Sequence, residues 1–144
     1  MSLYTSDFYA WTQEQAKALK NQQWEQLDLA NLLEEIEALG RRERQELRNR
    51  LGILLGHFLK WEYQPEKRGN SWIATIREQR RELLILLEEN PSLKSYLEEV
   101  LEISYQKGLD LAVYETGLSY STFPVSSPYS FVQILEQEFV SFDS

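Results

Sequence analysis

The residue types best suited to chemistry lie between His57 and Arg81, where the chain holds its only histidine and two of its four tryptophans. An imidazole can act as a general base or a metal ligand, because its pKa lies close to neutral pH. Indole rings stack on cations, and guanidinium groups bind oxyanions through two parallel hydrogen bonds. The stretch therefore offers five candidate ligand-binding residues: His57, Trp61, Trp72, Arg77 and Arg80.

Each of these candidates also has a structural interpretation. A lone histidine on the flank of an apolar stripe, as His57 is beside Phe58 and Trp61, is often a hydrogen-bonded residue at the edge of a core. Trp72 and Arg80 share one face of a predicted helix, so the arginine either lines an anion pocket with indole walls or pairs with an acid of another helix. We keep both interpretations and favour the structural one.

Other kinds of active site find little support in the residue pattern. The absence of cysteine excludes disulfides, zinc–thiolate sites and thiol chemistry, and one histidine cannot supply the paired Glu-x-x-His motifs of a di-iron bundle. The acids Glu34, Glu35 and Glu37 could bind a hard cation, but Glu37 and Arg41 have the spacing of a surface ion pair on a helix. No Gly-x-Ser-x-Gly elbow or phosphate-binding glycine loop occurs. We therefore predict no catalytic residue, no metal site and no cofactor.

Charge is arranged in three blocks along the chain, whose net charge is −8. Residues 41–81 carry eleven bases and five acids, whereas residues 1–40 and 82–144 are both acidic. Folding can neutralise the basic block against its acidic neighbours. Nucleic-acid binding by residues 41–81 is therefore the weakest functional hypothesis, because an acidic protein is repelled by phosphate.

Composition indicates an ordered, helical protein. The 144 residues are enough for a single core, and we expect one domain over residues 1–144. Six glycines and four prolines are too few for an all-β protein with frequent turns. The N-terminus lacks the features of a secretory signal, and no window of eighteen residues is free of charge. We therefore expect a cytoplasmic protein that does not cross a membrane.

A long central helix over about residues 29–63 is the main structural prediction. Apolar residues recur at every third or fourth position along it, Asp28 is suited to its N-cap, and Pro65 ends it. The pattern stays in phase across Gly40, where we expect one helix that is bent or broken. A glycine inside a helix costs only about 1 kcal/mol.

Within this helix, residues 51–61 are apolar around nearly the whole circumference. A helix with that pattern is buried, so these residues should form the centre of the core. Gly52 and Gly56 are four residues apart and share a face. Their small size could allow another backbone to approach closely.

Shorter helices on both sides give an all-α fold of about five helices. An extended Ser/Pro-rich segment, with Tyr120, Phe123 and Tyr129 as apolar anchors, precedes the last helix. Gly117 occupies the position where a helix commonly ends in the left-handed conformation. The predicted helices and their caps are 7–19 with Ser6 or Asp7, 71–89 with Ser71, 93–115 with Ser92, and 131–139 with the Ser130–Gln133 capping box.

Several segments together resemble the bacterial family catalogued as domain of unknown function 29, over nearly the whole chain. The most specific is the series Lys-Trp, Gln-Pro, Ser-Trp and Thr-Ile between residues 60 and 76. The resemblance implies a small all-helical protein and supplies no activity, cofactor or catalytic residue. The segments that carry it are residues 7–15, 27–44, 57–80, 86–94 and 123–135.

Three functional hypotheses remain from the sequence. The favoured one is a non-enzymatic protein-interaction domain that binds itself or another protein. The alternative is a domain, either a binding protein or an enzyme, that binds a small ligand or an oxyanion with the helical hairpin His57–Arg81. The third is the nucleic-acid association described above.

Overall fold

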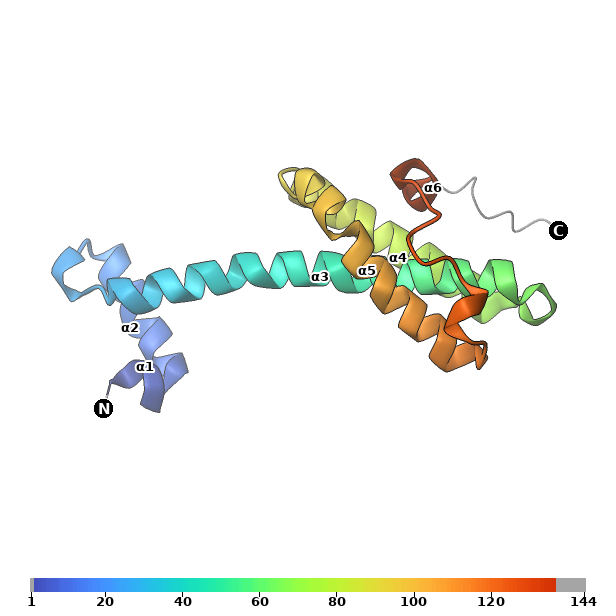
Figure 1. The fold of residues 1–144 in the computed structure, drawn as a ribbon. Helices are drawn as coiled ribbons and strands as arrows, with labels where there is room; N and C mark the ends of the chain where they lie inside the picture. Colours follow the sequence, from blue (N-terminus) through green and yellow to red (C-terminus); the bar gives the residue numbers. More distant parts are fainter. Residues whose placement is uncertain (1, 137–144) are drawn as a thin grey trace. The chain divides into compact units, whose positions relative to one another are not determined.

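The structure is a computed structural model that describes residues 2–136, and it confirms the all-α fold (Figure 1). Six α-helices and no β-strand occur in this part of the chain. The helix beyond the five predicted is a single N-terminal turn. The elements are α1 (Leu3–Ser6), α2 (Phe8–Lys20), η1 (Trp24–Gln26), α3 (Leu29–Tyr63), η2 (Pro65–Lys67), α4 (Asn70–Glu89), α5 (Leu93–Thr116), η3 (Tyr120–Thr122) and α6 (Phe131–Leu135).

The chain divides into two compact units, Met1–Arg42 and Glu43–Ser144. The first holds α1, α2, η1 and the start of α3, and the second holds the rest of α3 and the later helices. The expectation of a single domain over residues 1–144 stays a prediction beside this division.

In the first unit, local hydrogen bonds set the ends of the helices. The Asp7 side chain caps α2 by accepting from the backbone N–H of Ala10, as the sequence predicts. Asp28 precedes α3 and accepts hydrogen bonds from the Trp11 indole N–H at 3.0 Å and the Asn31 amide at 2.8 Å. Gln15 completes this junction, since its side-chain oxygen accepts from the Asp28 backbone N–H at 2.8 Å.

Helix α3 runs without interruption through Gly40, which confirms the single long helix and shows that it is not broken there. Gly40 is open to its surroundings: apart from the backbone of its own helix, a Cβ added there would meet no atom within 4 Å among the described residues. The modest helix cost of glycine is spread over a helix of 35 residues.

The core of the second unit is built around the C-terminal half of α3. Nearly every residue of 51–61 is buried, as the apolar pattern predicts. Figure 1 shows α4 and α5 alongside this half of α3. The fully buried apolar side chains come from these three helices and from α6: Leu47, Leu51, Leu54, Leu55, Phe58, Leu59, Ile76, Leu83, Tyr105, Ala112 and Ile134.

Helices α3 and α5 approach each other at three glycines. A Cβ on Gly108 would lie 2.7 Å from the Gly52 carbonyl oxygen and 2.7 Å from the Gly56 nitrogen. Gly52 and Gly56 therefore allow a second backbone to approach α3 closely, as their spacing predicts. That backbone is α5 at Gly108. The helices can pack this closely only because no side chain lies between them.

Several predicted ends of helices are confirmed and three predicted roles are wrong. Ser71 does not cap α4, because the helix begins at Asn70 with Gly69 at the N-cap position and has no side-chain cap hydrogen bond. Gly117 ends α5 with φ of 75°, and Ser130 with Gln133 forms the capping box of α6. Ser92 does not cap α5, because its backbone is already helical and its side chain makes no cap hydrogen bond. Tyr120 is exposed and binds Asp110 through its hydroxyl, so it does not anchor the tail.

The other two tail aromatics are buried as predicted, and the predicted extension of the last helix to residue 139 lies outside the described residues. Phe123 packs edge to face on Tyr63, and Tyr129 packs in the same way on Phe58. The Tyr129 hydroxyl donates to Glu62 at 3.0 Å. These contacts tie the extended segment to the end of α3.

Candidate functional site

His57 lies at the edge of the core, as its structural interpretation expects. It is 8% exposed, and its Nδ1 is 2.9 Å from the carbonyl oxygen of Ile53 on the preceding turn. A carbonyl can only accept a hydrogen bond, so Nδ1 carries the proton and the neutral ring keeps its lone pair on Nε2. Burial lowers the pKa of His57, and the nearby Lys60 ammonium lowers it further, while the Ile53 carbonyl and Glu115 act in the opposite direction. The histidine is therefore neutral at pH 7.

We expect the stability of the second unit to fall between pH 7 and pH 5 because of His57. Its folded-state pKa lies below the ordinary value of 6.5, so the unfolded chain binds the proton more readily. The stabilisation is complete above that value and is lost as pH falls through the lowered pKa. Urea unfolding at a series of pH values should show a shallower loss for His57→Asn, which keeps an N–H donor for Ile53 but does not titrate. An unchanged pH dependence in that variant would contradict this assignment.

Next to His57, the sequence interpretation missed an ion pair whose lysine is buried and whose glutamate is exposed. Lys60 is 6% exposed and its ammonium is 2.6 Å from a carboxylate oxygen of Glu115 on α5. The same ammonium lies 4.7 Å from the centre of the Trp72 ring. The sequence does hold one indication of this pair, because Lys60 lies inside the apolar segment 51–61 and a charge that is buried there needs a partner of opposite charge.

Trp61 belongs to a separate contact. Its backbone carbonyl accepts from Arg68 Nε at 2.7 Å, and the Arg68 guanidinium stacks 4.8 Å from the Trp61 ring centre. This arginine lies after η2, so the contact closes the connection between α3 and α4. Trp61 and Trp72 thus each contact a cationic side chain, but Trp61 contacts Arg68 and Trp72 contacts Lys60.

Arg80 is buried beneath α6 and pairs with backbone carbonyls. Its Nε donates to the Ile134 carbonyl at 2.9 Å and its Nη2 to the Gln133 carbonyl at 3.2 Å, both in the last turn of α6. The guanidinium also lies 5.4 Å from the centre of the Phe58 ring. Within residues 2–136 the partners of Arg80 are therefore carbonyls and a ring, where the structural interpretation expected an acid.

The five candidate residues divide into separate groups. Arg77 and Arg80 line one surface pocket of about 260 Å³ together with Arg81, Leu84, Ile85 and Glu88. Trp72 lies beside Lys60, and His57 makes its hydrogen bond within its own helix. The hairpin thus contributes a cationic pocket on α4 and a buried lysine that pairs with Glu115 of α5.

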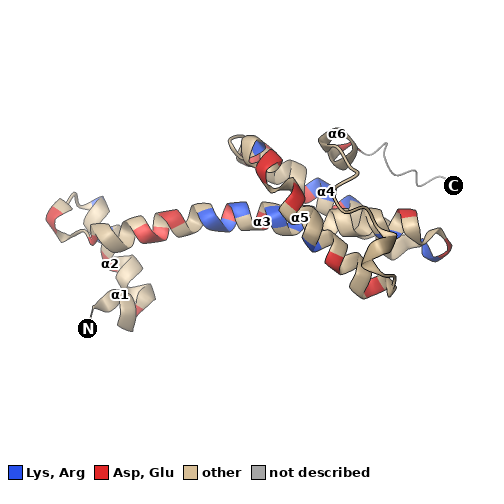
Figure 2. Ribbon diagram, in the orientation of Figure 1, with Lys and Arg blue, Asp and Glu red and all other residues tan. Residues whose placement is uncertain are grey.

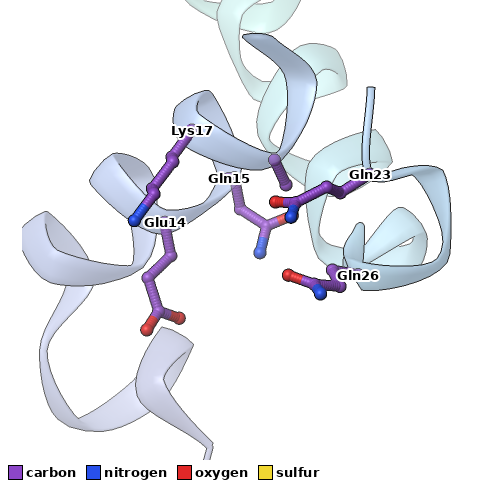
Figure 3. Close-up of a pocket in the computed structure, with 6 residues that line it drawn as sticks. Glu14, Gln15, Lys17, Gln23 and Gln26 are labelled. Atoms are coloured by element: carbon purple, nitrogen blue, oxygen red, sulfur yellow. The ribbon is translucent and has the colours of Figure 1, made fainter. Parts of the chain in front are cut away.

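The first unit has a second pocket, of about 390 Å³ (Figure 3). Figure 3 shows the amide ends of Gln15, Gln23 and Gln26 turned toward the same space, with Glu14 and Lys17 beside it. The oxygen of Gln15 already binds the backbone at Asp28. This lining offers hydrogen-bond donors and acceptors from the glutamine amides, and one charge of each sign. It therefore favours no particular class of ligand.

The first unit also exposes an apolar helix face. Along the start of α3, four large apolar side chains are more than half exposed: Leu29 at 68%, Leu33 at 57%, Ile36 at 63% and Leu39 at 57%. In the same segment, acids are followed by arginines along the helix (Figure 2). Arg41 lies 3.2 Å from Glu34 and 4.0 Å from Glu37, so these acids form the solvated, paired helix surface that the sequence indicates.

Comparison with known proteins places the chain in a family. No helix among the described residues has the length and apolar character needed to cross a membrane, and no group of three metal-ligating side chains occurs in that same range. No curated protein and no solved structure matched the chain. Residues 3–140 match the family model described as Domain of unknown function DUF29. The match covers nearly the whole of the chain, which therefore belongs to the DUF29 family.

Proposed function

We propose that this chain is a protein-interaction domain that pairs with a second copy of itself through the N-terminal part of α3. The observation that carries the proposal is the apolar surface defined by Leu29, Leu33, Ile36 and Leu39, each more than half exposed. Water-exposed apolar groups concentrated on one helix face are typical of protein-interaction surfaces.

The first unit has few means of covering this surface itself. Its buried apolar side chains are Trp11 and Ala18, whereas the main core cluster lies between Leu47 and Ile134 in the second unit. An isolated helix is only marginally stable in water, so a helix with an apolar face gains from packing against another. Each such side chain contributes about 1.5–3 kcal/mol when fully buried.

The order of charges supports a second copy as the partner, in antiparallel orientation. Glu34, Glu35 and Glu37 precede Arg41 and Arg42 on the same helix. When two copies cross antiparallel near residues 38–39, the acids of each copy lie beside the arginines of the other. A parallel pair would instead place like charges together, which is unfavourable.

Gly40 is suited to the centre of that crossing. It lies on the same face as Leu29, Leu33 and Ile36 at 100° per residue, and a Cβ there would meet nothing within 4 Å. Two helices can therefore approach closely at this point. Ile36 of each copy would then pack on Gly40 of the other, whereas Leu29 and Leu33 would lie along the methylene chains of the arginines in residues 41–48 of the other copy.

Sedimentation equilibrium across micromolar to near-millimolar concentrations tests the proposal. We expect a monomer–dimer equilibrium, with Ile36→Arg weakening the dimer at least tenfold, because a cation would replace an apolar side chain beside the arginines of the other copy (about 1.4 kcal/mol per tenfold). Ile103→Arg is the matched control, since Ile103 is a similarly exposed isoleucine on α5. A protein that remains monomeric throughout the range, or equal effects of the two variants, would contradict the proposal.

The orientation can be tested separately, because the chain has no cysteine of its own. Under mild oxidation, Gly40→Cys should form a disulfide-linked dimer, because the two positions lie near the crossing. Leu29→Cys should not, because antiparallel pairing separates its two copies by roughly 28 Å at 1.5 Å per residue. Efficient cross-linking of both variants would indicate a parallel pair.

A further inference from the structure

We infer that the pocket formed by Arg77, Arg80 and Arg81 on α4 is an oxyanion-binding site for a phosphate group. This site is independent of the self-association proposed above. It lies in the second unit, and its ligand is small.

The first observation is a buried cation with an unused donor. Arg80 is 1% exposed, and two of its nitrogens bind the carbonyls of Ile134 and Gln133. Its Nη1 is buried and has no hydrogen-bond partner among residues 2–136. No carboxylate in this part of the chain forms an ion pair with it. Because a buried charge is costly unless it is paired, the fold leaves a need for a negative group near this guanidinium.

The second observation is the placement of two further arginines around the same space. Positions 77, 80 and 81 share one face of α4, and all three side chains line the pocket of about 260 Å³. Arg80 is its buried member, whereas Arg77 and Arg81 are exposed. The only ion pair of Arg81 within the described range is a 3.9 Å contact with the neighbouring Glu82. Three cations this close repel one another, and an anion among them removes that repulsion.

The lining holds three arginines and one carboxylate, that of Glu88, so its charge favours an oxyanion. Guanidinium groups bind phosphate through paired, charge-assisted hydrogen bonds, and two exposed arginines can do so from one helix face. The volume is below the usual range of about 300–1,000 Å³ for organic ligands, so it suits inorganic phosphate or the phosphate of a small monoester. Leu84 and Ile85 continue the pocket along the helix and could contact an apolar substituent.

Calorimetric titration of the full chain with inorganic phosphate tests the site, with sodium chloride at equal ionic strength as the reference. We expect saturable binding of phosphate, and at least tenfold weaker binding in Arg77→Gln and in Arg81→Gln. Both residues are exposed, so these variants keep the fold, which circular dichroism checks. Lys94→Gln, at an exposed cation on α5, should bind as the unaltered chain does.

Phenyl phosphate distinguishes the two sources of the phosphate group. Tighter binding than inorganic phosphate would indicate a monoester whose apolar part contacts Leu84 and Ile85, and equal binding would indicate the phosphate ion itself. Either result supports the site. No heat of binding beyond the chloride reference, or undiminished binding in the Arg77→Gln/Arg81→Gln double variant, would overturn it.

Discussion

Gly108→Ala is expected to disrupt the packing of α3 on α5 and to destabilise the second unit severely. The added Cβ would lie 2.7 Å from two backbone atoms, the carbonyl oxygen of Gly52 and the nitrogen of Gly56. A flexible side chain could rotate away from such a contact, but these atoms move only if the whole helix moves. We therefore expect a loss at or above the upper end of the ~1–3 kcal/mol that is usual for overpacking. Urea unfolding followed by circular dichroism measures it.

Gly52→Ala is the matched control, because it adds the same methyl group at the same helix contact. Its Cβ would lie 3.2 Å from the Lys107 Cβ and 3.3 Å from the Ser104 carbonyl oxygen, which requires a shift of a few tenths of an ångström. Alanine also improves helix propensity by about 1 kcal/mol, so the net change should be small. Equal stabilities of Gly108→Ala and Gly52→Ala would show that α5 does not approach α3 as closely as described.

At the glycine contact between α3 and α5, the sequence predicts one of the two surfaces but not its partner. The spacing of Gly52 and Gly56 predicts that one face of α3 accepts another backbone, because helical periodicity is a local property. It does not identify Gly108 as the partner. That residue lies more than fifty positions away, and only the packing of the whole unit brings it to this face.

The same distinction applies to the other elements. The bounds of α2, α3 and α5 were predictable within about a residue, since they follow from caps, glycines and apolar periodicity. The interpretation of Ser92 as a cap failed because the backbone of Ser92 is itself helical and its side chain makes no cap hydrogen bond. Tyr120 was expected to be an anchor by residue type alone, and its hydroxyl instead finds Asp110 at the surface.

For the candidate site, residue types were informative and their partners were not. The sequence singles out His57 and Arg80 as candidate residues, and both are buried. That Arg80 binds the carbonyls of α6 depends on where a segment more than fifty residues later returns to α4. The pairing of Lys60 with Glu115 has the same origin, because no local pattern relates residues 55 positions apart.

That ion pair is asymmetric, which determines the effect of removing either partner. The side chain of Lys60 is 7% exposed, whereas that of Glu115 is 37% exposed. Without Glu115, the Lys60 ammonium would remain buried beside the Trp72 ring. It would have no carboxylate partner among the described residues. Without Lys60, the carboxylate could be hydrated where it stands. Breaking the pair therefore costs free energy mainly because the buried lysine is left with an unpaired charge.

Glu115→Ala is accordingly expected to destabilise the second unit by about 1–3 kcal/mol, the range for leaving a buried donor without its partner. Lys60→Met should be nearly neutral or stabilising, because methionine fills a similar volume without a charge to desolvate. Glu99→Ala, at an exposed acid on the same helix, is the control and should change stability little. Urea unfolding of the three variants gives the order. If Lys60→Met costs as much as Glu115→Ala, then the attraction between the two charges, rather than the burial of the lysine, dominates the energetics of this pair.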